Sequence, residues 1–66
     1  MRIQLNGQDH VLPGPMSLAT LVERLGFDRR KIAVERNLEI VPRSAYAATE
    51  LGEGDRLEIV NFVGGG

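Results

Sequence analysis

The sequence predicts a small α+β domain, in which one main helix covers a mixed sheet of about five short strands. Three observations predict this fold class. A hairpin signal at Asn6-Gly7 lies near the start, one amphipathic helical pattern follows it, and three short strand-like segments come after the helix. That order excludes a doubly wound sheet, which needs repeated crossovers, and leaves a single helix to cover one face of one sheet.

The hairpin is predicted from alternation and from its turn. Residues 2–5 alternate polar and apolar, and Asn6-Gly7 suits a type I′ turn, because both central residues of that turn need a positive φ. A two-residue loop fixes the register by counting, and the expected cross-strand pairs are Leu5 with Gln8, Ile3 with His10, and Met1 with Leu12. We therefore expect Leu12 in the core and Val11 pointing away, with the prolines of residues 13–15 ending the second strand.

The helix is predicted to follow Ser17, whose hydroxyl can accept a hydrogen bond from a free backbone N–H of the first turn. An apolar stripe then recurs at i, i+3, i+4 and i+7, formed by Leu18, Leu21, Val22 and Leu25. Glu23 and Arg24 occupy the opposite side. Gly26 suits the left-handed residue that ends many helices.

Three short strands are expected after the helix, at residues 32–34, 40–41 and 56–60. Between them we expect a turn at Asn37, one helical turn within residues 44–48, a lone apolar anchor at Leu51 and a turn at residues 52–55. The hairpin and the last strand can lie side by side with the helix across them. That arrangement is the β-grasp, or ubiquitin-like, fold.

Size, charge and composition narrow the possible function classes. A chain of 66 residues with 42% apolar and 26% charged residues is expected to be one ordinary globular domain. The net charge is −1, and the only basic cluster, residues 29–31, lacks interleaved aromatic residues, so we expect no nucleic-acid partner. No leader and no bilayer-length apolar run is recognised, which predicts a cytoplasmic protein without a membrane partner. The absence of cysteine excludes disulfides, thiolate metal ligands and a thiol nucleophile.

Catalysis by side chains is not expected. His10 is the only histidine, and a partly covered structural role opposite Ile3 explains it better than a catalytic one. Ser17 and Ser44 are both explained as helix caps. The aromatic residues Phe27 and Tyr46 are expected to pack against the sheet or to cover its edge.

A metal or phosphate site is not expected either. Glu50, Glu53 and Asp55 are close in sequence, but they surround a glycine turn without regular ligand spacing, which favours a solvated loop over a cation site. Residues 52–54 do not form a phosphate-binding loop, because neither a strand-to-helix transition nor a lysine follows them.

The C-terminus is the segment in which main-chain chemistry is expected. We expect residues 1–60 to form the β-grasp domain and residues 61–66 to form a flexible tail, which reaches on the order of 20 Å when extended. Gly64, Gly65 and Gly66 make this tail slim enough for a narrow tunnel in a partner enzyme. The Gly66 carboxylate is ionised and inert at neutral pH, so acyl chemistry requires its activation. A frayed or incidental terminus is the alternative.

An apolar docking surface beside this tail is a further hypothesis. Leu57 and Ile59 share one face of the last strand, and Val60 and Phe62 share the other, with Val63 extending it. If the first pair faces the helix, the second presents apolar surface to a partner. The alternatives are an ordinary outer sheet face, or a Phe62 side chain that folds back onto the core.

The chain resembles the ThiS family of sulfur carrier proteins over essentially its whole length. The matching segments are residues 1–7, 33–37, 40–44, 54–56, 58–60 and 62–66, together with Leu51. The terminal diglycine alone is a weak signal, since ubiquitin-like carriers and modifiers share it. Its combination with the short chain and the Val-Pro-Arg-Ser segment at residues 41–44 is specific.

The resemblance implies a carrier that is not itself an enzyme. In this family an E1-like enzyme of the ThiF type uses ATP to convert the terminal carboxylate, here that of Gly66, into an acyl adenylate. Sulfur from a persulfide-bearing protein then displaces AMP and leaves a thiocarboxylate. A thiazole synthase of the ThiG type receives the sulfur for the thiazole phosphate of thiamine. The resemblance also implies that no cofactor is bound, and a carrier of this small size would most simply be a monomer that forms transient complexes.

Three other functions stay open at this point. The small subunit of molybdopterin synthase loads sulfur on the same kind of tail, although those chains tend to be longer. A ubiquitin-like modifier would instead be joined through Gly66 to lysines of target proteins. A passive β-grasp interaction module would keep its function without residues 64–66.

Overall fold

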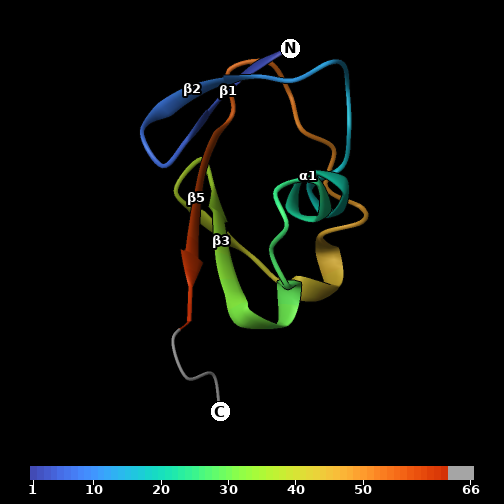
Figure 1. Ribbon diagram of the computed structural model, residues 1–66, viewed down its shortest axis with the longest axis vertical. Helices are drawn as coiled ribbons and strands as arrows, with labels where there is room; N and C mark the ends of the chain where they lie inside the picture. The colour runs from blue at the N-terminus through green and yellow to red at the C-terminus, as the bar shows by residue number, and fades with distance from the viewer. Residues whose placement is uncertain (63–66) are drawn as a thin grey trace.

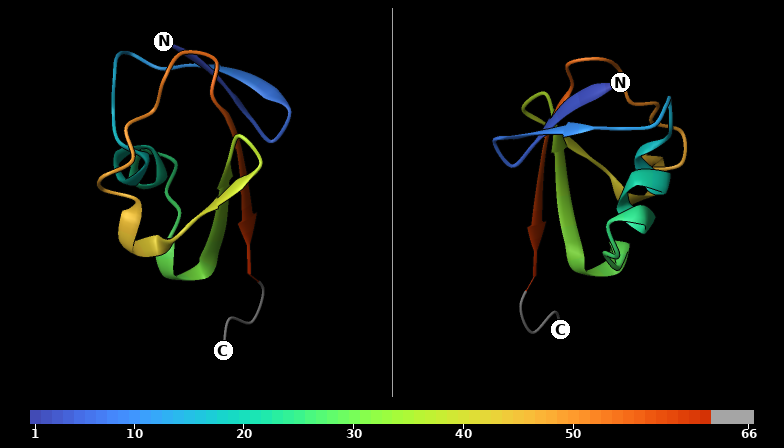
Figure 2. Two further views of the ribbon diagram at one scale, coloured as in Figure 1. Left: turned by 180° about the vertical axis from the view of Figure 1, so that it is seen from behind. Right: turned by 45° about the horizontal axis from the view of Figure 1, so that its top comes forward.

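The computed structural model describes residues 1–62, and the expected tail residues 63–66 lie outside this range. Its elements are β1 (Arg2–Leu5), β2 (Gln8–Val11), α1 (Leu18–Arg24), β3 (Ile32–Arg36), β4 (Glu39–Val41) and β5 (Arg56–Asn61), with short 3-10 turns at Arg29–Lys31 and Arg43–Ala45. The strands form one sheet in the order β2-β1-β5-β3-β4. β1 and β5 are parallel and the other neighbours antiparallel, and α1 covers one face (Figures 1 and 2). The predicted β-grasp fold is confirmed.

The β1–β2 hairpin has the predicted turn and register. Asn6 and Gly7 adopt φ values of 49° and 82°, as a type I′ turn requires. The register pairs are Leu5 with Gln8 and Ile3 with His10, and the Leu12 N–H donates to the Met1 carbonyl at 2.7 Å. Since side chains alternate between the faces of a strand, Leu12 is buried and Val11 is exposed, as predicted.

Helix α1 begins as predicted and ends earlier than its apolar stripe implied. The Ser17 hydroxyl accepts a hydrogen bond from the Thr20 N–H at 3.1 Å, and Leu18, Leu21 and Val22 are buried. The expectation that Leu25 joins this stripe is wrong: Leu25 is the C-cap residue and is 36% exposed. A helix of seven residues spans only two turns, so Leu25, the i+7 position, already lies at the end of the helix. The next residue, Gly26, has φ 81° and directs the chain away from the helix axis.

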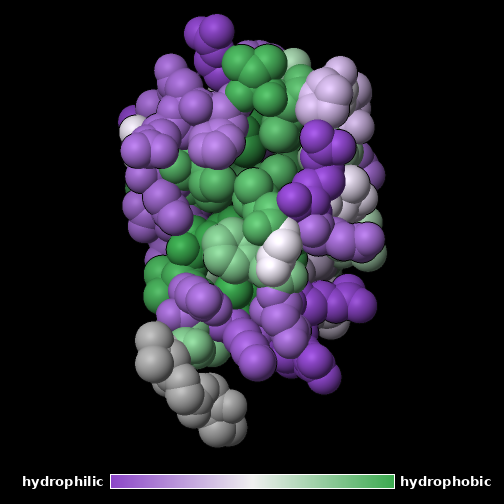
Figure 3. Space-filling view, in the orientation of Figure 1, coloured by the Kyte–Doolittle hydropathy of each residue, from purple (hydrophilic) through white to green (hydrophobic). Residues whose placement is uncertain are grey.

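The core lies between α1 and the inner face of the sheet. Its buried apolar residues are Ile3, Leu12, Leu18, Leu21, Val22, Ile32, Val34, Tyr46, Leu51, Leu57 and Ile59. Tyr46 is the largest of the fully buried side chains, so it packs inside the domain and not at the sheet edge. Figure 3 shows that apolar surface remains visible between the sheet and α1, and further apolar side chains packed against the core are only partly buried.

The second half of the chain follows the predicted order with changed limits. β3 continues to Arg36, and the turn that follows it contains Asn37 and Leu38, both at positive φ. The prediction that Ser44 caps a helical turn is wrong, because Pro42 holds the N-cap position and Ser44 lies inside the turn without a capping bond. β5 includes Asn61, and the Phe62 N–H donates to the Lys31 carbonyl at 2.7 Å, so the sheet extends past the expected boundary at residue 60.

Candidate functional site

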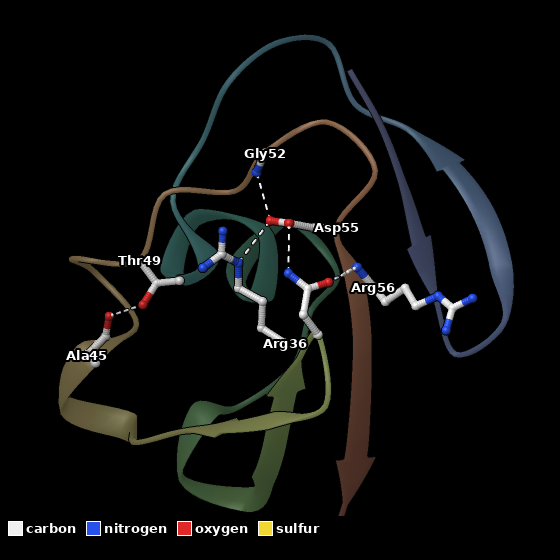
Figure 4. Close-up of polar contacts among 7 residues, drawn as sticks. Arg36, Ala45, Thr49, Gly52, Asp55 and Arg56 are labelled. Atoms are coloured by element: carbon white, nitrogen blue, oxygen red, sulfur yellow. Dashed lines mark hydrogen bonds and ion pairs between the residues drawn. The ribbon is translucent and has the colours of Figure 1, made fainter.

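The start of β5 is fixed by one buried carboxylate. Asp55 accepts hydrogen bonds from the Gly52 N–H at 2.7 Å, from Arg36 Nε at 2.9 Å and from Asn37 Nδ2 at 3.1 Å (Figure 4). Burial opposes ionisation of this carboxyl, but the three donors and the Arg36 charge outweigh it and hold the pKa of Asp55 below its usual value. The prediction of a solvated loop is therefore wrong for Asp55, which ties the β3–β4 turn to the first residue of β5.

The neighbouring acidic residues do not join Asp55 in a site. Glu53 accepts a hydrogen bond from the Arg2 N–H at 3.1 Å, and Glu50 lies exposed in an isolated bridge with Ser17. No cluster of three His, Asp or Glu side chains suited to a metal ion occurs within residues 1–62. His10 is half-buried on β2 opposite Ile3, as predicted. In the described part of the chain, no helix is long and apolar enough to cross a membrane.

The C-terminal half of β5 is held on one side by a side chain in place of a strand. β1 pairs with β5 only at Arg56 and Leu57. Beyond that point, Asn6 Oδ1 accepts from the Ile59 N–H at 2.9 Å, and Asn6 Nδ2 donates to the Ile59 carbonyl at 3.3 Å. The sequence predicted Asn6 only as a turn residue. The Asn6 side-chain amide has both a donor and an acceptor, and this is the sequence signal that could have pointed to the second role.

β3 supports the other edge of β5 from Leu57 to Asn61. The antiparallel register runs from Arg36 opposite Leu57 to Ile32 opposite Asn61. In Figures 1 and 2, β5 runs away from the β1–β2 hairpin toward the opposite end of the molecule. The strand therefore delivers Phe62 at an end of the domain, and the segment after it begins there.

The two faces of β5 differ as the docking hypothesis requires. Leu57 and Ile59 are buried beneath α1, whereas Val60 is 58% and Phe62 47% exposed. Phe62 is not among the partly buried apolar side chains that pack against the core, which argues against the alternative in which it folds back. The other alternative, an ordinary outer sheet face, stays open. Val63 and the three terminal glycines, the other residues of the hypothesis, lie outside the described residues.

The exposed apolar surface also includes residues that the sequence analysis did not select. Leu38 is 83% and Ile40 67% exposed, at the β3–β4 turn and on β4. Glu35 lies opposite both Ile40 and Glu58, and Ala33 lies opposite Val60, so these side chains share the sheet face that points away from α1. We call this the outer face. Within residues 1–62, the exposed apolar side chains of the outer face suit contact with a partner protein.

Comparison with known proteins adds independent findings. Residues 3–66 match the model of the ThiS family. A thiazole synthase of Paramagnetospirillum magneticum is 50% identical over 66 residues, which cover all of this chain and 20% of that protein. This chain thus spans about a fifth of that relative's length, and the same share of a thiazole synthase of Magnetococcus marinus.

Two relatives match over 98% or more of their own length. The sulfur carrier protein ThiS of Bacillus subtilis is 37% identical over 67 residues, which cover 97% of this chain and 98% of that protein. The crystal structure of a thiamine biosynthesis protein (ThiS) from Geobacter metallireducens superposes with a TM-score of 0.85 and 30% identity, with all of both chains covered.

Proposed function

This chain belongs to the ThiS family of sulfur carrier proteins, and we propose that it carries sulfur as a C-terminal thiocarboxylate for the synthesis of the thiazole of thiamine. The observation that carries the proposal is the exit of β5. This strand leads to the terminal residues beside exposed apolar side chains, Val60 and Phe62, at an end of the domain. The match to a sulfur carrier of the same length supports it.

The proposed chemistry takes place at Gly66. On an E1-like enzyme of the ThiF type, the Gly66 carboxylate attacks the α-phosphate of ATP. This attack forms an acyl adenylate and releases pyrophosphate. A persulfide sulfur then attacks the acyl carbon and AMP leaves. A thiol cleaves the remaining sulfur–sulfur bond, which leaves the thiocarboxylate on the carrier. ATP is bound by the activating enzyme, and the carrier itself binds no cofactor.

The carrier's own residues position this chemistry and do not catalyse it. Gly64, Gly65 and Gly66 carry no side chains, so the terminus can enter a narrow active site and let enzyme backbone groups approach closely. Val60, Phe62 and Val63 contribute apolar docking surface next to this terminus. The activating enzyme and the thiazole synthase both bind the folded domain.

A thiazole synthase of the ThiG type is the proposed acceptor of the sulfur. In two relatives, the segment similar to this chain is part of a protein named thiazole synthase. A carrier segment and a synthase in one polypeptide support a working partnership between the two. This comparison also favours thiazole synthesis over molybdopterin synthesis as the destination of the sulfur.

Intact mass spectrometry tests the proposal. After incubation with the activating enzyme, ATP and a persulfide donor, we expect the carrier to gain the mass of one oxygen-to-sulfur exchange. A variant without Gly66 is expected to gain nothing and to keep the wild-type melting temperature. Normal sulfur loading of that variant would refute the assignment, and a ladder of conjugates with other proteins would favour the modifier function.

A further inference from the structure

Two glutamates lie directly opposite each other on the outer face. Glu35 of β3 and Glu58 of β5 are register partners in an antiparallel pair, which places their Cβ atoms about 4.5–5.5 Å apart. β3 and β5 run side by side in Figure 1, with α1 on the other side of the sheet. Like charges in this arrangement destabilise a sheet. The fold therefore carries an unfavourable pair in the middle of an exposed face.

No cation of the described chain neutralises this pair. The ion pairs within residues 1–62 are Arg30–Asp28 and Arg36–Asp55, and neither contains Glu35 or Glu58. Arg56 lines the same shallow groove as the two glutamates, but it forms no ion pair with them. The groove therefore holds two carboxylates and one guanidinium, and it keeps a net negative charge.

Apolar side chains surround the acidic pair. Leu38 lines the groove, Ile40 lies across from Glu35, and Val60 follows Glu58 by two positions on the same face. All three side chains are more than half exposed. A partner that covers them would remove water from the carboxylates, and charged contacts strengthen when water is excluded.

We propose that the outer face docks a thiazole synthase surface in which an arginine or lysine is surrounded by apolar residues, and that this basic side chain inserts between Glu35 and Glu58. The inference rests on the proposed function and adds the chemistry of the partner surface. One cation meets two carboxylates there, forms charge-assisted hydrogen bonds and removes the repulsion between them. The face is continuous with Val60 and Phe62, so docking places the chain end at the synthase.

The test depends on substitutions that are expected to stabilise the fold and to weaken binding to the synthase. Glu35→Gln and Glu58→Gln keep side-chain size and remove the repulsion, so each is expected to raise the melting temperature by roughly 1–4 °C. Each is also expected to weaken binding to the cognate thiazole synthase roughly tenfold and to reduce the salt dependence of the dissociation constant. Glu23→Gln, on the exposed side of α1, is the matched control and is expected to change neither.

Binding is measured by fluorescence anisotropy with the full-length carrier and the synthase, and again with the activating enzyme. Dissociation constants of both variants within twofold of the Glu23→Gln control would overturn the proposal. A loss of affinity for the activating enzyme alone would also overturn it. So would wild-type carrier that does not bind the synthase. Sulfur loading of Gly66 is followed separately. Normal loading with unchanged synthase binding rejects this inference and leaves the proposed function standing, whereas absent loading of the wild type rejects the proposed function.

Discussion

The Asp55 side chain connects its own loop to the end of β3 and the turn that follows it. Its carboxylate accepts from the loop at Gly52, from Arg36 at the end of β3 and from Asn37 in the following turn. Asn37 Oδ1 in turn accepts from the Arg56 N–H at 3.0 Å, next to Asp55 itself (Figure 4). A carboxylate with three donors is stabilised in its charged form, and its removal would leave those donors without a partner.

The stability contributed by Asp55 is expected to depend on pH. The folded-state pKa lies below the ordinary value of 3.8, so the contribution is fully present above that value and is lost as pH falls through the folded-state pKa. Asp55→Asn is expected to lower the free energy of unfolding by about 1–3 kcal/mol at pH 7. Urea denaturation at pH 7 and at pH 3 measures the difference from wild type.

That difference should shrink at the lower pH, because pH 3 lies below the ordinary carboxyl pKa of 3.8, and the stability contributed by the lowered pKa of Asp55 decreases below that value. Asp9→Asn, an exposed change on β2, is the control for general effects of charge. An Asp55→Asn defect of the same size at both pH values would contradict the assignment of the charged carboxylate as the stabilising form.

At the level of elements, β5 depends on a residue outside any strand. β1 ends at Leu5, and the two-residue turn to β2 follows, while β5 continues to Asn61. The Asn6 side chain fills the position where a neighbouring strand would bond to Ile59, and the Asn6 N–H donates to the Leu57 carbonyl at 2.9 Å. A turn residue therefore also anchors the strand that leads to the chain end.

Two substitutions separate these roles of Asn6. Asn6→Gly keeps the positive φ and removes both side-chain hydrogen bonds, so it is expected to destabilise the domain by about 1–2 kcal/mol. Asn6→Ala adds the strain of a left-handed alanine, about 1–2 kcal/mol more. Equilibrium denaturation measures both, and hydrogen exchange at the Ile59 amide should accelerate in each. A wild-type exchange rate at Ile59 in Asn6→Gly would show that the side-chain bonds do not anchor β5.

The whole molecule divides its surfaces between folding and recognition. One side of the sheet is buried under α1, and the outer face combines exposed apolar residues with the Glu35–Glu58 pair. Because the outer face contributes little to the core, its residues can change without loss of the fold. Partner binding and stability should therefore respond to different substitutions.

Val60→Ser tests this division. Val60 is 58% exposed, so its replacement is expected to change the free energy of unfolding by less than about 0.5 kcal/mol. The loss of apolar docking surface should reduce the rate of sulfur loading several-fold. Val11→Ser, also exposed but on the edge strand β2, is the control and should load normally. Equal loading rates for Val60→Ser and Val11→Ser would exclude Val60 from the surface that the activating enzyme binds.

Features that depend on near neighbours in sequence were predicted well. The Asn6-Gly7 turn and the register that follows from it are correct, as are the Ser17 cap and the sharing of one strand face by Leu57 and Ile59, although the sequence left open which face that is. Each follows from residues a few positions apart, through backbone φ, capping or side-chain alternation. Leu25 and Ser44 were predicted wrongly because a helical period says little about where so short a helix or turn begins and ends.

The sequence by itself determined the hairpin, the burial of Leu18, Leu21 and Val22 on α1, and the family through its matching segments, whereas the structure decided which face of β5 points inward. Only the tertiary structure decided the burial of Asp55, the anchoring of β5 by Asn6 and the meeting of Glu35 with Glu58. Asn6 and Ile59 are 53 positions apart, and which backbone groups meet across such a separation depends on how the strands pair. Strand pairing is a property of the assembled sheet, because it follows from the packing of all its members against one helix.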